Sequence, residues 1–373
     1  MNVKFEEAER VPVKDINVWP RDPLHYHVEF SFHARHYPLG YPLEISTNSS
    51  EVIRAAEQSW GVFPHLYSAR PVHIRVGVVE SGSKGLPLPP VYRAQHNLIT
   101  IVSDAENFAT CDVTSGFAFC WVSSSTIENL DFFRYHFLDL IVGVLVAPQH
   151  FAIVHSACVA LDDRGVLLCG HSGAGKSTLA FACARRGWTF ISDDAAYVQR
   201  RNPQPVVLGN PLSFRLRENS ADLFPELGQH PIIRRQNGEM GFEVATANLP
   251  DCLTAFQCHI DFFIFLDRRY TGPARLNEIP TNEAFRRLDG FLDYTLAYAD
   301  PFLNGSDPQR ILYDPKAREE QRAALRKLLV GGTYELQYST CEAAVQQLVA
   351  LIRGDKTAPR TPKGNAEYRN AKL

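Results

Sequence analysis

The hydrophobic positions along the chain follow two different patterns, one in each part of the sequence. Over 26–32 and 72–78 apolar residues alternate with polar ones, which predicts two half-buried strands. Between them Asn48 can cap a helix, with Glu51 three residues later and apolar residues at helical spacing after it. Shorter runs predict further strands over 98–102 and 117–122. This part of the chain therefore reads as a small α+β domain.

From about residue 150 the apolar runs become short and continuous. The runs 165–169 and 262–266 are apolar at nearly every position, which is typical of strands buried on both faces in the middle of a sheet. A helix is expected over 130–147, where the two patterns meet. Further helices are expected over 315–330 and 340–352, with a strand between them that carries Tyr334, Leu336 and Tyr338 on one face.

These patterns divide the chain into three segments. Residues 1–128 are expected to form a smaller N-terminal α+β domain with a role in substrate recognition, and residues 129–354 a larger α/β domain. Residues 355–373 are polar, mildly basic and contain proline, so we expect a disordered tail there.

Composition narrows the function classes without selecting one. The 373 residues are 45 % hydrophobic, enough for a large core, and the net charge of -3 argues against a nucleic-acid partner. The longest apolar stretch, 140–147, is too short to span a bilayer, and no apolar signal segment opens the chain, so no membrane association is expected. The eight cysteines form no CxxC pair and several lie in apolar runs, as is typical of reduced thiols in a cytoplasmic protein.

The strongest chemical signal is the segment 170–177, which matches the pattern GxxxxGK[ST]. Its glycines let successive backbone N–H groups point at phosphate oxygens. Lys176 supplies a mobile charge for the β- and γ-phosphates, and the Ser177 hydroxyl can ligate Mg²⁺. A buried run precedes the segment and an alanine-rich helix follows it to Gly187, which is the context that a phosphate-binding loop (P-loop) requires. The residues expected to contact Mg-ATP here are Gly170, His171, Ser172, Gly173, Ala174, Gly175, Lys176, Ser177 and Thr178.

Two carboxylates follow the next expected strand. Residues 188–191 lead into Ser192, Asp193 and Asp194, which places the pair at the end of a strand beside the P-loop, where an open α/β sheet locates its site. One carboxylate could hold Mg²⁺, and the other could accept a proton from an attacking hydroxyl or orient a water. The alternative is a helix cap and a solvated loop carboxylate.

The segment from His155 to Asp194 resembles the catalytic core of the HPr kinase/phosphorylase family. That family has a histidine opening the strand before the P-loop, a GxSGxGKS loop, a helix ending in Arg-Gly and an Asp-Asp pair, and all four recur here at compatible spacing. The resemblance implies a P-loop kinase domain of the HPr kinase type, which phosphorylates a serine with ATP and Mg²⁺. Carried over by position, Lys176 and Ser177 take the phosphate and metal roles. Asp193 becomes the base, Asp194 a metal or water ligand, and His155 a neighbour of the carboxylates, with a core histidine as its alternative.

The sequence also departs from the family pattern. The second P-loop position, usually acidic in the bacterial HPr enzymes, is His171, and the residue after the P-loop serine, usually Glu, is Thr178. We do not find the glycine-rich segment of the phosphorylase half. The chain therefore resembles more closely the HPr-kinase-related proteins outside sugar-transport control, some of which phosphorylate a serine on ribosomally made peptides, including lasso-peptide precursors.

Three weaker features complete the candidate set. Arg215 or Arg217 could clamp a transferring phosphoryl group, and we place Arg215 among the nucleotide-binding residues. Asp267 competes with Asp194 for Mg²⁺, or pairs with Arg268 or Arg269 at a strand end. A histidine cluster lacks a cysteine or clear carboxylate partner, so we expect surface residues rather than a metal site; its members are His25, His27, His33 and His36.

Together these features predict a cytoplasmic kinase that transfers the γ-phosphoryl group of ATP to a serine of a protein or of a ribosomally made precursor peptide. Two alternatives stay open, a kinase for a small hydroxylated metabolite and a nucleotide-dependent switch in which ATP controls partner binding. The sequence leaves the oligomeric state open, a homo-oligomer included.

Overall fold

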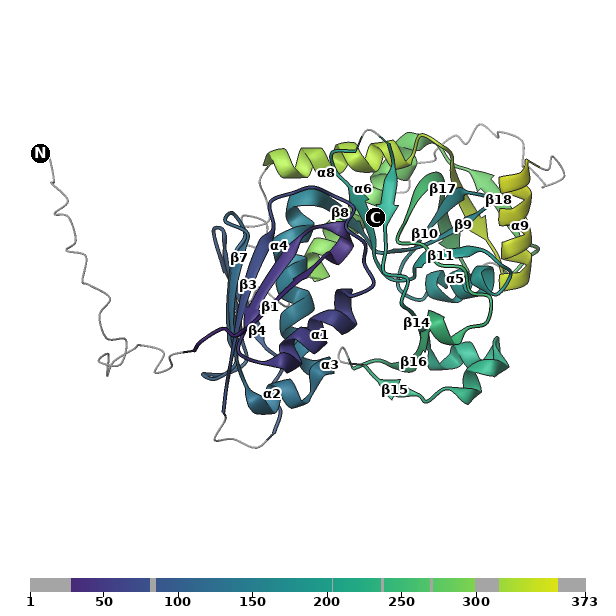
Figure 1. Ribbon diagram of the computed structural model, residues 1–373. Helices are drawn as coiled ribbons and strands as arrows, with labels where there is room; N and C mark the ends of the chain where they lie inside the picture. The colour runs from purple at the N-terminus through teal and green to yellow at the C-terminus, as the bar shows by residue number, and fades with distance from the viewer. Residues whose placement is uncertain are drawn as a thin grey trace, which may run out of the picture.

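The computed structural model describes residues 28–80, 85–202, 204–235, 238–268, 271–298 and 315–354. Its strands form a seven-stranded, a nine-stranded and a three-stranded sheet, with helices packed against the two larger ones (Figure 1). The α/β class expected from the sequence is therefore confirmed. The expected tail over 355–373, together with His25, His27 and Arg269, lies outside the described residues.

The seven-stranded sheet belongs to the N-terminal part of the chain. Its order is β1-β2-β3-β7-β6-β5-β4; β2, β3 and β7 run parallel, and the other neighbours pair antiparallel. A helix, α1 (Ser50–Trp60), makes the crossover that the parallel pair β2 and β3 requires. The strands are β1 Phe32–His36, β2 Leu43–Thr47, β3 Val72–Val79, β4 Val91–Gln95, β5 Leu98–Val102, β6 Phe108–Asp112 and β7 Phe117–Ser123.

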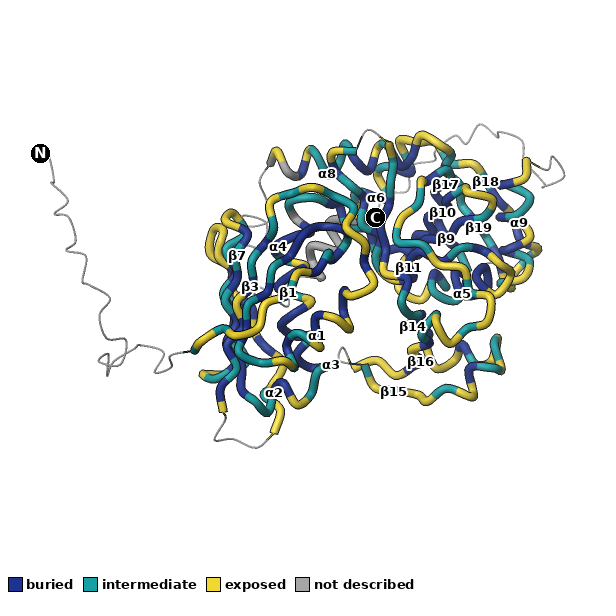
Figure 2. The backbone as a smooth tube through the Cα atoms, in the orientation of Figure 1, coloured by how far each residue is buried: buried dark blue, intermediate teal, exposed yellow. Residues whose placement is uncertain are grey.

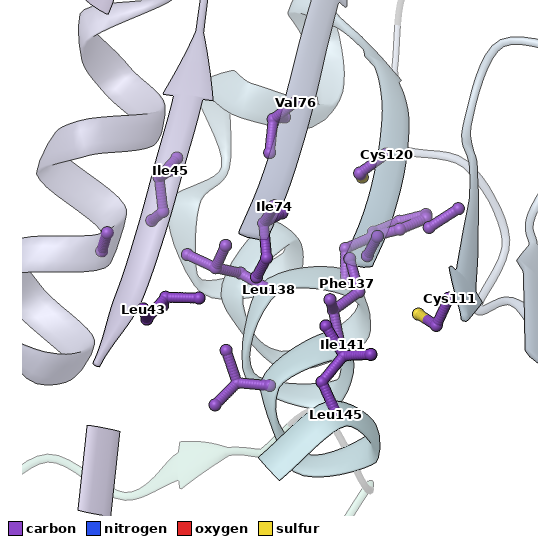
Figure 3. Packing of buried hydrophobic residues seen from close by; sticks show 14 of the residues in the cluster. Leu43, Ile45, Ile74, Val76, Cys111, Cys120, Phe137, Leu138, Ile141 and Leu145 are labelled. Atoms are coloured by element: carbon purple, nitrogen blue, oxygen red, sulfur yellow. The ribbon is translucent and has the colours of Figure 1, made fainter. Parts of the chain in front are cut away.

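One face of this sheet packs against helices. Strand residues such as Ile45 and Ile74 share a core with Phe137 and Ile141 of the helical segment that follows β7 (Figure 3). Burial alternates along β2 and β3, because only this face is covered, and the opposite face keeps the polar residues. The segment consists of α2 Ser124–Glu128, α3 Leu130–Phe133, a π-helical turn Arg134–Leu138 and α4 Asp139–His150.

The nine-stranded sheet contains the continuous apolar strands. Its order is β11-β9-β10-β17-β13-β12-β8, with β19 beside β17 and β18 beside β19; β10, β17 and β19 run parallel. The strands are β8 Phe151–Val154, β9 Ser156–Leu161, β10 Arg164–Cys169, β11 Thr189–Ser192, β12 Ala196–Gln199, β13 Val206–Leu208, β17 Gln257–Asp267, β18 Arg275–Glu278 and β19 Thr333–Gln337.

Helices cover both faces of the middle of this sheet, which is dark blue in Figure 2. Val166 and Leu168 of β10 enter a core with α5 (Lys176–Ala184) and α9 (Cys341–Arg353). Leu167 and Cys169 enter a second core with α6 (Thr281–Tyr298) and α8 (Pro315–Leu328). This double burial explains why the run is apolar at every position, and it confirms the prediction of a central strand.

The three-stranded sheet packs onto the α5 side. Its order is β14-β16-β15, with β14 Ser213–Arg217, β15 Ile233–Arg234 and β16 Met240–Ala245. Phe214 of β14 stacks on Phe190 of β11, with ring centroids 3.8 Å apart. The small sheet is therefore anchored at the strand that leads into Asp193 and Asp194.

Some N-terminal predictions are wrong in detail. Of the strand expected over 26–32, residues 28–31 are irregular and only Phe32 lies in a strand, β1; residues 26 and 27 lie outside the described residues. Ser49, not Asn48, caps α1, because the Asn48 side chain bonds both the N–H and the C=O of Val78. A π-helical turn interrupts the helix expected over 130–147, which continues to His150.

The remaining global expectations concern the cysteines, the membrane and the domain boundary. All eight cysteines are free thiols, as expected. In the ranges described above, no helix is long and apolar enough to cross a membrane. The division at residue 128 stays a prediction.

Candidate active site

Four strands of the nine-stranded sheet bring the expected site residues to one edge. Because β9 runs antiparallel to β10 and β11, its beginning lies beside their ends, and Ser156 pairs with Cys169. Since β17 runs parallel to β10, with Cys169 opposite Phe265, Asp267 ends its strand at the same edge. His155, the P-loop, Asp193 and Asp267 therefore meet although they are far apart in the sequence.

The P-loop curls between β10 and α5. Gly173 and Gly175 have φ values of 82° and 92°, which favour glycine. A Cβ on Gly175 would also lie 2.5 Å from the hydroxyl of Tyr338, which donates a hydrogen bond of 3.0 Å to the carbonyl of Ala174. Tyr338 follows β19 and is fully buried, so its hydrogen bond supports the loop from the core of the domain. Sequence reasoning placed Tyr338 on an apolar strand face and missed this role.

Lys176 lies inside the loop. Its Nζ donates to the carbonyl of Gly170 at 2.9 Å and to that of His171 at 3.2 Å. Burial lowers the pKa of the ammonium. Ser177 and Thr178 stand beside it in the first turn of α5, half-buried, while His171 to Gly173 are exposed. A buried cation bonded by loop carbonyls, at the start of a helix with free N–H groups, fits a polyphosphate.

Asp193 is the buried member of the carboxylate pair. The residue is 5 % exposed, and its carboxylate accepts a hydrogen bond of 2.6 Å from the backbone N–H of Arg215, while its carbonyl accepts one of 3.2 Å from the Ser177 hydroxyl. Burial is the main reason that its pKa rises to about 7; the charge of Asp194 also raises it, and the Arg215 N–H opposes the shift. A carboxyl group with this pKa can exchange a proton near neutral pH.

Asp194 has the opposite electrostatic environment. The Nδ1 atom of His155 lies 3.3 Å from its carboxylate and 2.9 Å from its backbone carbonyl, and Nη1 of Arg215 lies 3.7 Å from the other carboxylate oxygen. The hydrogen bond with His155 is the largest cause that lowers the pKa of Asp194. The structure thus brings His155, Asp194 and Arg215 together, and it separates the pKa values of two adjacent carboxyl groups, a pattern typical of acid–base sites.

Arg217 reaches the P-loop although Arg215 was the residue selected from the sequence. Its Nη2 donates to the Ser172 hydroxyl at 3.0 Å and lies 3.7 Å from Glu239. The alternation of β14 puts Phe214 and Leu216 inward and both arginines outward, so a period of two in the sequence could have placed the pair on one face.

Tyr135 of the π-helical turn also belongs to the surroundings of the site, and sequence reasoning missed it. Burial raises its pKa, and the charges of Arg215, Asp194 and Glu239 act on it as well. The turn, whose Phe137 belongs to the core of the seven-stranded sheet, therefore lies within electrostatic reach of the carboxylates.

Two residues remain candidates for Mg²⁺ besides Ser177. Asp194 is half-exposed beside Arg215, and Asp267 ends β17, where its backbone carbonyl accepts the N–H of Tyr338 at 3.1 Å. Within the described residues no group of three or more His, Cys, Asp or Glu side chains could hold a metal ion. A magnesium ion bound with a nucleotide needs only one or two protein oxygens, so the residues present fit that mode.

The order of the strands, together with the P-loop between β10 and α5 at one edge of the nine-stranded sheet, defines a P-loop nucleotide-binding fold of the α/β class. Residues 147–214 match the family model described as HPr Serine kinase C-terminal domain. This segment, from the end of α4 to β14, is therefore HPr-kinase-like, and the resemblance seen in the sequence is confirmed over it.

The remaining comparisons are weaker. Among curated proteins none matches the chain. A similar solved structure is the Hpr(Ser) kinase/phosphatase from Coxiella burnetii, at 18 % identity and a TM-score of 0.20, over 32 % of this chain and 62 % of that one. The chain thus spans less than two thirds of that protein, and likeness at this level defines neither activity nor substrate.

The raised pKa of Asp193 predicts a pH-dependent stability. Between the ordinary carboxyl pKa and about 7 the folded chain holds a proton that the unfolded chain has released, so the contribution of Asp193 to stability falls as pH rises through this range. Asp193→Asn keeps an acceptor for the Arg215 N–H but does not titrate. As the pH increases from about 5 to about 8, we expect the melting temperature of the variant to increase relative to that of the wild type. A difference that stays constant over this range would contradict the assignment.

Proposed function

We propose that this protein is an ATP-dependent kinase that transfers the γ-phosphoryl group to a serine hydroxyl of a protein or ribosomally made peptide. One observation carries the proposal: the P-loop with its buried Lys176 lies beside two carboxylates whose pKa values are shifted in opposite directions. A nucleotide-dependent switch needs the P-loop but has no need of a proton acceptor with a pKa of about 7. The HPr-kinase-like segment 147–214, which contains all these residues, supports serine as the acceptor.

Phosphate binding is assigned to the P-loop. Lys176 would exchange the carbonyls of Gly170 and His171 for phosphate oxygens, which offer a full negative charge. The N–H groups of the loop and of the first turn of α5 add to this attraction. Arg215 lies beside the carboxylate oxygen of Asp194 that His155 does not contact, and its guanidinium is suited to contact the transferred group.

The carboxylates take separate roles. Asp193 accepts the proton of the acceptor hydroxyl, and the backbone N–H of Arg215 holds its carboxylate in place. Asp194 and the Ser177 hydroxyl would hold Mg²⁺, and His155 would orient Asp194 through its Nδ1 atom. Mg²⁺ when bound neutralises part of the charge on the phosphates. Most of the rate enhancement then comes from positioning and electrostatics.

Lys176→Ala should abolish phosphoryl transfer and weaken ATP binding, because it removes the mobile cation of the loop. The measurement is the rise in melting temperature on adding millimolar Mg-ATP, which reports binding to the folded state. Lys327→Ala is the control, since that lysine bonds the carbonyl of Asn202 away from the P-loop and should keep the full rise. Absence of any rise in the wild type would refute nucleotide binding itself.

Asp193→Asn should lower turnover by roughly 10² or more while ATP affinity changes little, because the variant has lost its proton acceptor. Wild-type turnover should rise with pH through about 7, as Asp193 ionises, and this rise should disappear in the variant. Asp194→Asn should instead raise the Mg²⁺ concentration needed for half-maximal rate. If both substitutions have equal, small effects on rate, neither residue belongs to the site.

The acceptor should be a serine in a polypeptide. Labelled ATP is incubated with the enzyme and with either a peptide encoded by a neighbouring gene or a panel of hydroxylated metabolites, and the product is mapped by mass spectrometry. Phosphoserine in the peptide is the expected product. Labelling of free serine, with none in any peptide, would transfer the proposal to a metabolite kinase, and nucleotide binding without transfer to any hydroxyl would indicate a switch.

A further inference from the structure

The face of the seven-stranded sheet that points away from the core with α1 and α4 carries an aligned set of side chains. The register of β1, β2, β3 and β7 aligns them in two rows across the four strands. The rows are Arg35–Glu44–His73–Phe117 and His33–Ser46–Arg75–Phe119. Most of these residues line a hollow of about 420 Å³. We call this surface the basic–aromatic face.

The charges on this face are unequal. Its single carboxylate, Glu44, is bonded by Arg35 and lies 3.2 Å from Nδ1 of His73, so its charge is already compensated. The guanidinium of Arg75 lies 5.8 Å from the ring centroid of Phe117 and has no ion pair among the described residues. Two arginines against one glutamate leave an excess of positive charge at the hollow.

An aromatic wall borders the basic residues. The rings of Phe119 and Trp121 stack with centroids 5.7 Å apart. Trp121 itself is buried, with 3 % of its surface exposed, and it occupies the space beside Gly77 of β3, where a Cβ would come within 2.3 Å of its ring. The buried indole therefore packs against Phe119, and the half-buried rings of Phe117 and Phe119 form the accessible part of the wall.

We propose that the basic–aromatic face binds an acidic segment of the polypeptide substrate, with an apolar residue of that segment against the aromatic wall. The proposal rests on the proposed function for its choice of a polypeptide. Charge complementarity selects an acidic segment, because the excess at Arg75 is unpaired. From β1 to β7 the face spans three strand spacings, about 14 Å, which matches roughly four residues of an extended chain and exceeds a small anion.

The position of the face separates docking from chemistry. α1 and α4 lie on the other side of the sheet, between it and the strands that carry the P-loop (Figure 1). A peptide bound here would be held by one part while its serine reaches the carboxylates elsewhere, which raises the local concentration of the acceptor. Substitutions on this face should therefore act on peptide affinity and leave ATP binding unchanged.

The test is direct binding by fluorescence anisotropy with the full chain. The probes are two fluorescein-labelled octapeptides, one of alternating glutamate and leucine and one with glutamine in place of glutamate. We expect the acidic probe to bind about ten-fold more tightly, and the double variant Arg35→Gln/Arg75→Gln to lose about ten-fold in affinity for it, as two exposed ion pairs allow. The preference should weaken with added salt.

Two variants make the result specific. Arg93→Gln changes an exposed arginine on β4, at the opposite edge of the same sheet, and should bind the acidic probe as wild type does. Lys176→Ala should also keep full affinity for the probe, so loss of kinase activity and loss of docking are read separately. Equal binding of both probes by the wild type overturns the proposal. So does an equal loss of affinity in Arg93→Gln and in the double variant.

Discussion

The hydrogen bond from the backbone N–H of Arg215 to the buried carboxylate of Asp193 is the contact on which the site depends. It joins the three-stranded sheet to the end of β11, and Phe214 next to it stacks on Phe190 of that strand. The carbonyl of Asp193 accepts the Ser177 hydroxyl, so the same residue also fixes the first turn of α5. A buried carboxylate without a hydrogen-bond donor would destabilise the fold. The backbone N–H of Arg215 supplies this donor, so the hydrogen bond fixes the position of β14 next to Asp193. Both arginines of β14 then face the P-loop and its neighbours.

Burial and pairing give the two adjacent aspartates different chemistry. Asp193 loses most of its solvent and its pKa rises to about 7, whereas Asp194 gains His155 and Arg215 as partners and its pKa falls. Neither residue type nor order in the chain distinguishes them. The difference arises because β9 runs antiparallel and delivers His155 to the exposed member of the pair. The same edge holds Lys176 ready to exchange weak carbonyl partners for phosphates.

The two large sheets use their faces differently. The nine-stranded sheet is covered on both faces, and its candidate site lies at the edge where β9, β10, β11 and β17 meet. The seven-stranded sheet is covered on one face only, and its open face offers a broad polar and aromatic surface instead. The sequence reflects this asymmetry: β10 is apolar over 165–169, whereas polar residues alternate with apolar ones along β2 and β3 although these strands also run parallel.

The sequence alone determined the features that depend on local chemistry. The apolar run of β10, the glycines with positive φ at 173 and 175, and the helix from Lys176 follow from short-range rules, and they identify the P-loop without any tertiary information. The alternation over β3 was equally readable. The sequence could not tell that Ser49 would cap α1, because Asn48 is recruited by Val78, thirty positions away. It also could not tell that Arg217, rather than Arg215, would contact Ser172. The support of the P-loop by Tyr338 and the position of Arg35 and Arg75 on one face were equally beyond it. These outcomes were decided by strand order and register, because such contacts join residues whose distance is set only when the sheets assemble.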